Sequence, residues 1–326
     1  MIDAILVIDK PSGMTSHDVV ACVRRILGER SVGHLGTLDP LATGVLPLLI
    51  GRYTRLAQFF GNTAKSYEGV IRLGFATDTY DADGEPFGPV STEIKVTLED
   101  LQSSARRFLG NVRQTPPHFS AKKIAGVPAY KLARKKQDVE LTDVQVHVER
   151  FEISSLESDR AFFTVKVSAG TYVRSLAHDL GKLLGVGAHV AELRRTASGE
   201  FALEQAVTLD RLQEMKEGAV ARGLDIGDWI GEISVHPRRI LRQLPSITVN
   251  SETAGLIANG RAVNLADLSS AHQVKVFADE RRLLAVASRI AGTLFQPKVV
   301  FQPKVVAWTI VGIVFGGFFG HICNVR

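Results

Sequence analysis

The chain has 326 residues, of which 45% are hydrophobic and 22% are charged, so it can bury the core of one large domain with a small domain beside it. Its formal net charge of +5 is compatible with a polyanionic partner, although many enzymes without one carry a similar excess. Cys22 and Cys323 have no metal-ligand spacing, which argues against a disulfide framework and a zinc site and favours a reducing cytoplasm. We expect no signal peptide, because the charged segment 1–10 is too short for one.

The first expected elements are a strand, a helix and a second strand. The apolar run Ala4–Ile8 predicts the first strand. Apolar residues then recur with helical spacing over 19–27, so we expect a helix that Ser16 caps and Gly28 ends. The run Val45–Ile50 predicts a buried strand.

The elements that follow do not alternate regularly between strand and helix. Thr97 and Asp100 have the spacing of a capping box and predict the start of a helix. The elements expected in this region are strands at 65–74, 145–153 and 161–167 and helices at 98–109 and about 175–184. We therefore predict an α+β fold with a mixed, largely antiparallel central sheet flanked by helices, and not a doubly wound sheet.

A small second module is expected near the C-terminus. The segment 236–239 has the composition of a linker, and the residues after it suit short strands and one short helix. The predicted domains are a catalytic domain at 1–240, which includes a basic insertion at about 116–140, a mostly β domain at 241–301 and an anomalous apolar tail at 302–326.

The tail begins with a duplication. The hexamer Phe-Gln-Pro-Lys-Val-Val at 295–300 is repeated without change at 301–306, and the stretch 305–323 carries no acidic or basic side chain. A stretch of this length is sufficient to cross a bilayer. Two interpretations stay open, a membrane anchor or a duplication or frameshift that replaced the natural end, and the unchanged repeat favours the second. Membrane fractionation of the full chain beside a version that ends at Phe301 separates them.

The most informative stretch is the glycine-rich segment Gly33–Gly44, in which Asp39 precedes Pro40. Proline restricts its own φ and the conformation of the residue before it, and glycine permits tight turns and close approach. The carboxylate of Asp39 is therefore expected on a stiff loop. An isolated Asp-Pro pair more often closes a turn or caps a helix, so the loop alone does not establish a function.

The whole Gly33–Gly44 string resembles the catalytic loop of the TruB family of tRNA pseudouridine synthases. Further segments that resemble the family are 6–16, 65–74, 77–84, 115–123, 170–176 and 189–196. The C-terminal module more weakly resembles the PUA RNA-binding domain. The resemblance implies a pseudouridine synthase fold of the bacterial standalone type with a PUA-like domain after it.

The resemblance also implies a reaction. Pseudouridine formation detaches uracil from ribose C1′ and rejoins it through carbon, which requires no cofactor and no metal. It does require a carboxylate that acts as a nucleophile or stabilises positive charge on the sugar, and Asp39 matches that residue. Arg174 matches its guanidinium partner, which keeps the acid ionised in a site without water. Tyr67 matches the ring that stacks on the target base and is a candidate acceptor for a proton from C2′.

Three more residues match the family's substrate pocket. Tyr172 is expected beside Tyr67, and Leu193 is expected to form an apolar floor. His34 is expected to stack where the extruded base has left the RNA. For the two tyrosines and Leu193, the competing interpretation is ordinary core packing, because such side chains are usually buried.

Basic residues are expected to hold the RNA while the target uridine is extruded. Lys122 and Lys123 lie in the insertion, Arg194 follows the expected pocket floor, and Lys10 lies in the first matching segment. The insertion resembles the loop that clamps the T arm in standalone bacterial members and that guide-RNA-dependent relatives lack. We therefore expect tRNA as the substrate, bound through its T arm and modified at position 55, by a cytoplasmic monomer that needs no protein partner.

Two other motifs do not support their usual functions. The segment Asp78–Gly84 resembles a calcium loop, but Thr79 breaks the acidic spacing and no glutamate closes it. The glycines at 181–187 do not form GxGxxG after a strand, so a nucleotide cofactor has no support. The alternatives to an enzyme are a tRNA-binding folding protein without catalysis and, from the tail alone, a membrane-tethered adaptor.

Overall fold

The computed structural model describes residues 2–91, 93–117, 123–124, 127–128, 142–267 and 269–301. The chain divides into two compact units, Met1–Gln243 and Leu244–Arg326. We describe each unit by itself.

The first unit is built on a ten-stranded mixed sheet. In chain order its strands are β1 (Ala4–Lys10), β2 (Val32–His34), β3 (Thr43–Ile50), β4 (Lys65–Leu73), β7 (Gly110–Gln114), β10 (Val144–Glu157), β11 (Arg160–Val167), β12 (Ala188–Ser198), β13 (Phe201–Ala202) and β14 (Ala206–Val207). The sheet order is β14-β1-β3-β12-β4-β11-β10-β7, with β2 paired to β3 and β13 paired to β12. Among these described strands only the β1–β14 and β3–β12 pairs are parallel, so the prediction of a mixed, largely antiparallel sheet is confirmed. Two short hairpins lie outside the sheet, β5 (Ala76–Thr77) with β6 (Pro86–Phe87) and β8 (Lys123–Ile124) with β9 (Val127–Pro128).

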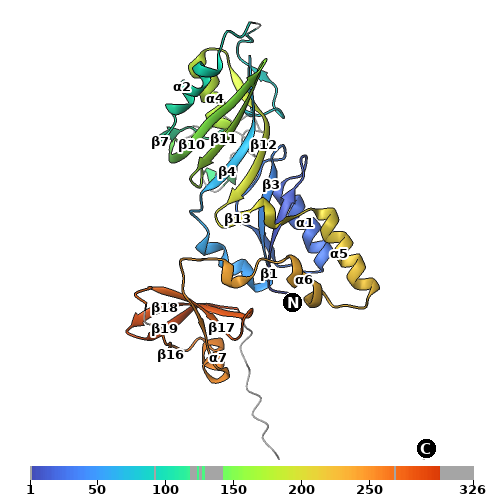
Figure 1. Cartoon of the computed structure of the whole chain (residues 1–326), viewed down its shortest axis with the longest axis vertical. Helices are drawn as coiled ribbons and strands as arrows, with labels where there is room; N and C mark the ends of the chain where they lie inside the picture. Colours follow the sequence, from blue (N-terminus) through green and yellow to red (C-terminus); the bar gives the residue numbers. More distant parts are fainter. Residues whose placement is uncertain are drawn as a thin grey trace, which may run out of the picture. The chain divides into compact units, whose positions relative to one another are not determined.

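Helices flank both halves of this sheet (Figure 1). The α-helices of the unit are α1 (Ser16–Leu27), α2 (Leu98–Arg106), α4 (Val173–Leu184), α5 (Leu209–Ala221) and α6 (Ile226–Ile233), and the 3-10 helices are η1 (Gly51–Phe59), η2 (Leu203–Gln205) and η3 (Pro237–Arg239). Helices α2 and α4 pack on β10 and β12, and α5 and α6 pack by β1. Neither α5 nor α6 was expected from the sequence.

The N-terminal cap of α1 differs from the prediction by one residue. Thr15 is the cap: its hydroxyl accepts from Asp18 N, and Asp18 accepts from Thr15 N in return. Ser16 begins the helix, and its hydroxyl instead accepts from Leu38 N at 2.8 Å and donates to Leu38 O at 3.0 Å. The serine was expected to cap the helix, but it ties the helix to the residue directly before Asp39.

The predicted linker at 236–239 lies within the first unit, where its last three residues form η3. The reason is a polar anchor that follows it: the Glu200 carboxylate accepts from the amides of Leu241 and Arg242 at 2.6 and 2.8 Å. The chain therefore stays with the first unit beyond that segment.

Strand β12 joins the two halves of the sheet. It pairs in parallel with β3 and antiparallel with β4, which places Arg195 opposite both Gly44 and Tyr67. Gly44 has φ +96°, and a Cβ there would lie 2.2 Å from the carbonyl oxygen of Arg195. Only glycine permits this approach. The close pairing brings the loop before β3, which carries Asp39, next to the strand that carries Tyr67.

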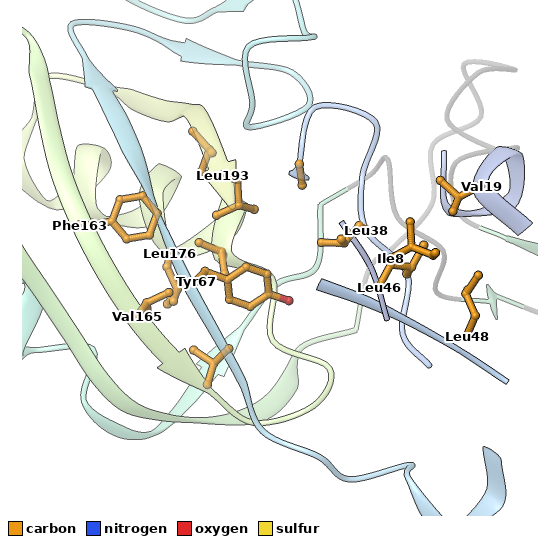
Figure 2. Close-up of a cluster of buried hydrophobic side chains, with 14 of the residues drawn as sticks. Ile8, Val19, Leu38, Leu46, Leu48, Tyr67, Phe163, Val165, Leu176 and Leu193 are labelled. Atoms are coloured by element: carbon orange, nitrogen blue, oxygen red, sulfur yellow. The ribbon is translucent and has the colours of Figure 1, made fainter. Parts of the chain in front are cut away.

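The core continues through this junction (Figure 2). Tyr67, Phe163 and Leu176 belong to one region of the cluster, and Leu38 and Ile8 belong to the region beside it. The Tyr67 ring is buried, and its hydroxyl points from β4 toward the side on which Leu38 lies. The residue before Asp39 is thus part of the packed core, which makes the loop stiff.

The second unit is small and mostly β. Its elements are β15 (Ser246–Thr248), α7 (Ser251–Ala258), β16 (Val263–Asn264), β17 (Gln273–Phe277), β18 (Leu283–Ala291) and β19 (Leu294–Val300), and its sheet order is β15-β17-β18-β19-β16. Its own apolar cluster includes Ile257, Val274 and Phe295. The predicted mostly β module is confirmed. The tail at 302–326 lies outside the described residues, and within the described part of the chain no helix is long and apolar enough to span a bilayer.

Candidate active site

The carboxylate of Asp39 meets the guanidinium of Arg174 where the loop before β3 faces the start of α4. Arg174 Nε lies 2.9 Å from Asp39 Oδ2, and Nη2 donates to Oδ1 at 3.2 Å. This two-point contact, one hydrogen bond and one ion-pair contact, engages both carboxylate oxygens. The Asp39 side chain is 38% exposed and that of Arg174 only 6%. The acid is therefore accessible from solvent, and the cation is buried behind it.

The segment Thr79–Asp81 holds Arg174 from its other side. Arg174 Nη1 donates to Thr79 O at 2.8 Å and to Asp81 Oδ2 at 3.1 Å. Asp81 is buried, and its second oxygen accepts from the Thr79 hydroxyl and from Asp83 N. One guanidinium thus bridges two carboxylates, and Asp81 sets the direction in which Arg174 faces Asp39. No role was expected for Asp81 from the sequence, although it lies in the segment 77–84 that resembles the family.

Helix α4 begins two residues earlier than predicted, at Val173, so Arg174 lies in its first turn. Its start is held by Gln114, a buried residue at the end of β7. Gln114 accepts from Tyr172 N at 2.8 Å and donates to Tyr172 O at 3.0 Å, and the Ser175 hydroxyl donates to Thr115 O. These contacts fix the helix end that carries the arginine.

A cavity of about 350 Å³ opens at the Asp39–Arg174 pair, within the size range of small-ligand sites. Its walls bring together Asp39, Tyr67, Tyr172, Arg174 and Leu193 from four separate elements. The remaining lining residues are Gly36, Thr37, Leu38, Ala42, Lys65, Gly170, Thr171 and Val173. The catalytic set expected from the resemblance, together with Tyr172 and Leu193, therefore surrounds a single pocket.

Arg195 ties the Asp39 loop to Tyr67. This fully buried residue of β12 donates to Val45 O at 2.7 Å, to Gly36 O at 3.1 Å and to Thr37 O at 3.4 Å. It also forms a side-chain hydrogen bond with Tyr67. A guanidinium has enough donors to make all of these contacts at once. No role of its own was expected for Arg195 from the sequence.

The side chain of Lys10 also binds the backbone of the loop that carries Asp39. The residue is fully buried, and its ammonium donates to Pro11 O at 2.8 Å, Met14 O at 2.6 Å and Pro40 O at 3.1 Å. Burial lowers the pKa of Lys10 from 10.5 to about 8, and the nearby Asp39 carboxylate opposes that shift. The expected contact of Lys10 with substrate stays a prediction, and its three donors already bind carbonyl oxygens of the protein.

Burial in the pocket favours the neutral forms of the Asp39 carboxyl and the Tyr67 phenol. Desolvation raises the pKa of Asp39 above its ordinary value, Arg174 opposes this shift, and Asp81 adds to it. Desolvation likewise raises the pKa of Tyr67, which Arg195 opposes. Tyr67 is therefore a neutral phenol at physiological pH. The Arg174 guanidinium is the main group that favours the ionised form of Asp39.

Other expected RNA contacts lie outside this pocket. His34 ends β2 and is half-buried, and burial with the nearby Arg195 charge lowers its pKa, so the ring is neutral. Arg194 pairs with Asp9 at 2.7 and 3.0 Å, and it lines a second hollow that includes Glu68 and Phe162. Their roles in RNA binding stay predictions. Lys122 lies outside the described residues, and for Lys123 only the backbone of β8 is described.

Comparison with solved structures defines the class to which this fold and site belong. A chain from the crystal structure of a Cbf5–Nop10–Gar1 complex matches with a TM-score of 0.68 and 26% identity, over 92% of this chain and 85% of that one. A chain from the archaeal box H/ACA sRNP Nop10–Cbf5 complex matches with a TM-score of 0.66 and 27% identity, over 93% and 87%. The fold is that of the pseudouridine synthases, as predicted.

Sequence relatives narrow the class to one family. Residues 24–173 match the model of the TruB family pseudouridylate synthase N-terminal domain, and residues 174–225 match that of the tRNA pseudouridylate synthase B C-terminal domain. A tRNA pseudouridine synthase B of Solibacter usitatus is 45% identical, over 91% of this chain and 99% of its own length. One from Bacillus pumilus is 36% identical, over 88% and 93%. The chain belongs to the TruB family, which confirms the resemblance.

Proposed function

We propose that this protein is a tRNA pseudouridine synthase, an isomerase that converts the T-loop uridine at position 55 of tRNA to pseudouridine. The observation that carries the proposal is the Asp39 carboxylate, held at two points by Arg174 in a pocket that Tyr67 and Leu193 also line. Relatives that match nearly the whole chain bear the name of this activity.

The carboxylate acts on the glycosidic bond of an extruded uridine. The bond between N1 and C1′ breaks with its electron pair going to uracil, and Asp39 stabilises the positive charge on the ribose or bonds to it. Uracil then rotates, and C5 bonds to C1′ as any bond between Asp39 and C1′ breaks; C5 afterwards loses its proton and N1 gains one. The atoms of substrate and product are the same, so the reaction consumes no second substrate and no redox partner. Direct attack at C1′ and elimination across C1′ and C2′ are both compatible with this geometry.

Tyr67 and Leu193 enclose the base while it turns. Tyr67 presents an aromatic ring, and Leu193 supplies an apolar wall without competing hydrogen bonds. Because the buried Tyr67 phenol is protonated, it must first give up its own proton if it accepts one from C2′. Its hydrogen bond with Arg195 eases that step, since a nearby cation favours the phenolate.

The contacts with RNA are proposals on a wider surface. Extrusion of a base costs about a few kcal/mol, which phosphate contacts and stacking have to offset. We assign this task to His34, Arg194, the insertion with Lys122 and Lys123, and the small β domain as a PUA-like module. We also propose that the protein acts as a monomer on the T arm of tRNA in a reducing cytoplasm, and the compartment agrees with the lack of a disulfide or metal-ligand pattern around Cys22 and Cys323.

The first test uses the unaltered protein. Purified full-length chain is incubated with unmodified tRNA transcripts, and pseudouridine is mapped at single-nucleotide resolution. We expect one modified site, the T-loop uridine, without added metal or cofactor. A transcript with the T-loop uridine replaced by cytidine is the matched control. A product at another position, or none, contradicts the proposal.

The pH dependence of the rate follows from two pKa shifts. On the acid side we expect the single-turnover rate to fall as protonation neutralises Asp39, at a pH above the 3.8 of an ordinary aspartate. On the alkaline side we expect a fall near pH 8, because a neutral Lys10 amine has two donors for three carbonyl oxygens and no longer braces the loop. Rates measured from pH 4 to 10 with saturating enzyme test both limbs. A rate that stays flat through pH 8 contradicts the role of Lys10.

The competing function is that of a tRNA-binding protein that helps tRNA fold without catalysis. Such a protein has no chemical need for a carboxylate, a guanidinium and a tyrosine around one pocket, and this favours the enzyme. Extrusion of the base does disturb the tRNA elbow, so binding without turnover can still matter in the cell.

A further inference from the structure

Tyr80 has a strained backbone and lies in the segment that binds Arg174. It lies between Thr79 and Asp81, the two residues that bind Arg174 from behind. Its φ is +65°, in the left-handed region that residues other than glycine rarely adopt. A backbone in this state persists only where its surroundings hold it there.

Two kinds of contact hold Tyr80. Its amide donates to Thr77 O at 3.2 Å, and its carbonyl accepts from Val190 N at 3.0 Å. Its ring stacks on that of His178, with centroids 3.9 Å apart and planes 14° from parallel. The backbone contacts fix the segment along the sheet, and the ring contact fixes it against α4.

His178 lies on α4 one turn after Arg174, so the two side chains emerge from the same face of the helix. The helix therefore holds the segment 79–81 twice, with Arg174 through polar contacts and with His178 through ring stacking. The His178 Nδ1 atom is buried and has no hydrogen-bond partner among the described residues. Burial and the Lys182 charge lower the pKa of the imidazole, so it is neutral. The imidazole therefore contacts Tyr80 by ring stacking, and its Nδ1 atom makes no hydrogen bond with the described residues.

We propose that the Tyr80–His178 ring pair is a positioning device that orients Asp81 and the Thr79 carbonyl, and through them the Arg174 guanidinium that holds Asp39. Neither ring is part of the pocket lining, so the pair acts through Arg174 and not on the substrate. The proposal rests on the function proposed above, because its consequence is a property of the catalytic carboxylate.

The test removes one ring at a time and compares three quantities. His178→Ala removes the imidazole, and Tyr80→Gly removes the phenol while relieving the backbone strain, so it remains informative if the alanine variant folds poorly. For both we expect a single-turnover rate about 10-fold lower, unchanged tRNA affinity and an acid limb at higher pH, because a mobile Arg174 stabilises the Asp39 carboxylate less well.

Conservative and double variants sharpen the test. His178→Phe keeps a flat ring and is expected to restore both the rate and the acid limb. The double variant is expected to be no slower than either single variant, because the rings act as one unit. His147→Ala is the matched control. His147 lies on β10, where its ring is hydrogen-bonded to Asn111, and this variant is expected to behave like the unaltered protein.

One readout does not depend on turnover. The pKa of Asp39 is measured by carboxyl carbon NMR and assigned through Asp39→Asn, and it should rise in both ring variants. If the unaltered protein makes no pseudouridine, the proposed function fails, while the NMR titration still judges the ring pair. An unchanged Asp39 pKa, or a lower melting temperature with an unchanged rate and acid limb, overturns the positioning role.

Discussion

Replacement of Asp39 by asparagine is expected to abolish pseudouridine formation and to leave tRNA binding in place. Asparagine keeps the size of the side chain and still offers an oxygen to Arg174. It has no negative charge to stabilise the sugar and is a poor nucleophile. Loss of the group on which the charge stabilisation depends costs at least about 10³-fold in rate. The measurement is single-turnover product formation with saturating enzyme, beside tRNA affinity from filter binding.

The binding measurement separates the enzyme from the folding protein. Removal of a negative charge near the phosphates is expected to leave the affinity equal or slightly higher. Asp159→Asn is the matched control, because Asp159 also pairs with an arginine, Arg72 at 2.9 Å, and neither residue lines the pocket. Normal yield from Asp39→Asn dismisses the mechanism. A parallel loss of affinity and rate shows instead that Asp39 serves in binding.

The second large effect is expected from Arg174→Lys. One ammonium cannot contact both oxygens of Asp39 while it also reaches Thr79 O and Asp81, so the carboxylate loses its fixed orientation. We expect a rate about 10²- to 10³-fold lower, the range seen when one aimed donor is removed from an active site. The acid limb of the pH profile should move to higher pH, because Arg174 is the main group that lowers the pKa of Asp39.

The stability of Arg174→Lys has to be measured beside its rate. Arg174 is buried and bridges two carboxylates, so a shorter cation is expected to lower the free energy of unfolding by about 1–3 kcal/mol. Arg72→Lys makes the same substitution in an exposed pair and controls for the change of residue type. If the rate of Arg174→Lys equals that of the unaltered enzyme, then the two-point contact with Asp39 has no catalytic importance.

Helices and strands could be predicted from the sequence where the residues that stabilise them lie within the same short segment. The capping box at Thr97 and the alternation through 65–74 both depend on neighbours within a few residues. Both elements formed, although the helix expected at 98–109 ends at Arg106. The one-residue error at Ser16 has a local and a distant cause. Thr15 and Asp18 have the same capping-box spacing as Thr97 and Asp100, which favours Thr15 as the cap. The bond that engages Ser16 instead is made to Leu38, which is distant in the chain.

The residues of the site also fall into two groups, those that the sequence revealed and those that only the structure revealed. Asp39, Tyr67 and Arg174 stood out because each lies in a distinctive string of residues. Asp81 and Arg195 did not, because their importance arises from partners that are remote in sequence. Lys10 was expected to touch RNA, and its burial under the Asp39 loop could not be inferred from a charged residue at the end of a strand.

By itself the sequence determined the chemical groups of this protein, many of its local elements and its family, because motifs, caps and periodic patterns depend on residues that are close along the chain. Only the tertiary structure decided which charges meet. The pairing of β12 with both β3 and β4 brings the acid and the tyrosine together, with the buried Arg195 bonded to both segments, and Arg174 on α4 joins them in the pocket lining. Hydrogen bonds and ion pairs act over a few ångströms in space, so separation in sequence does not reveal them until the sheet has formed.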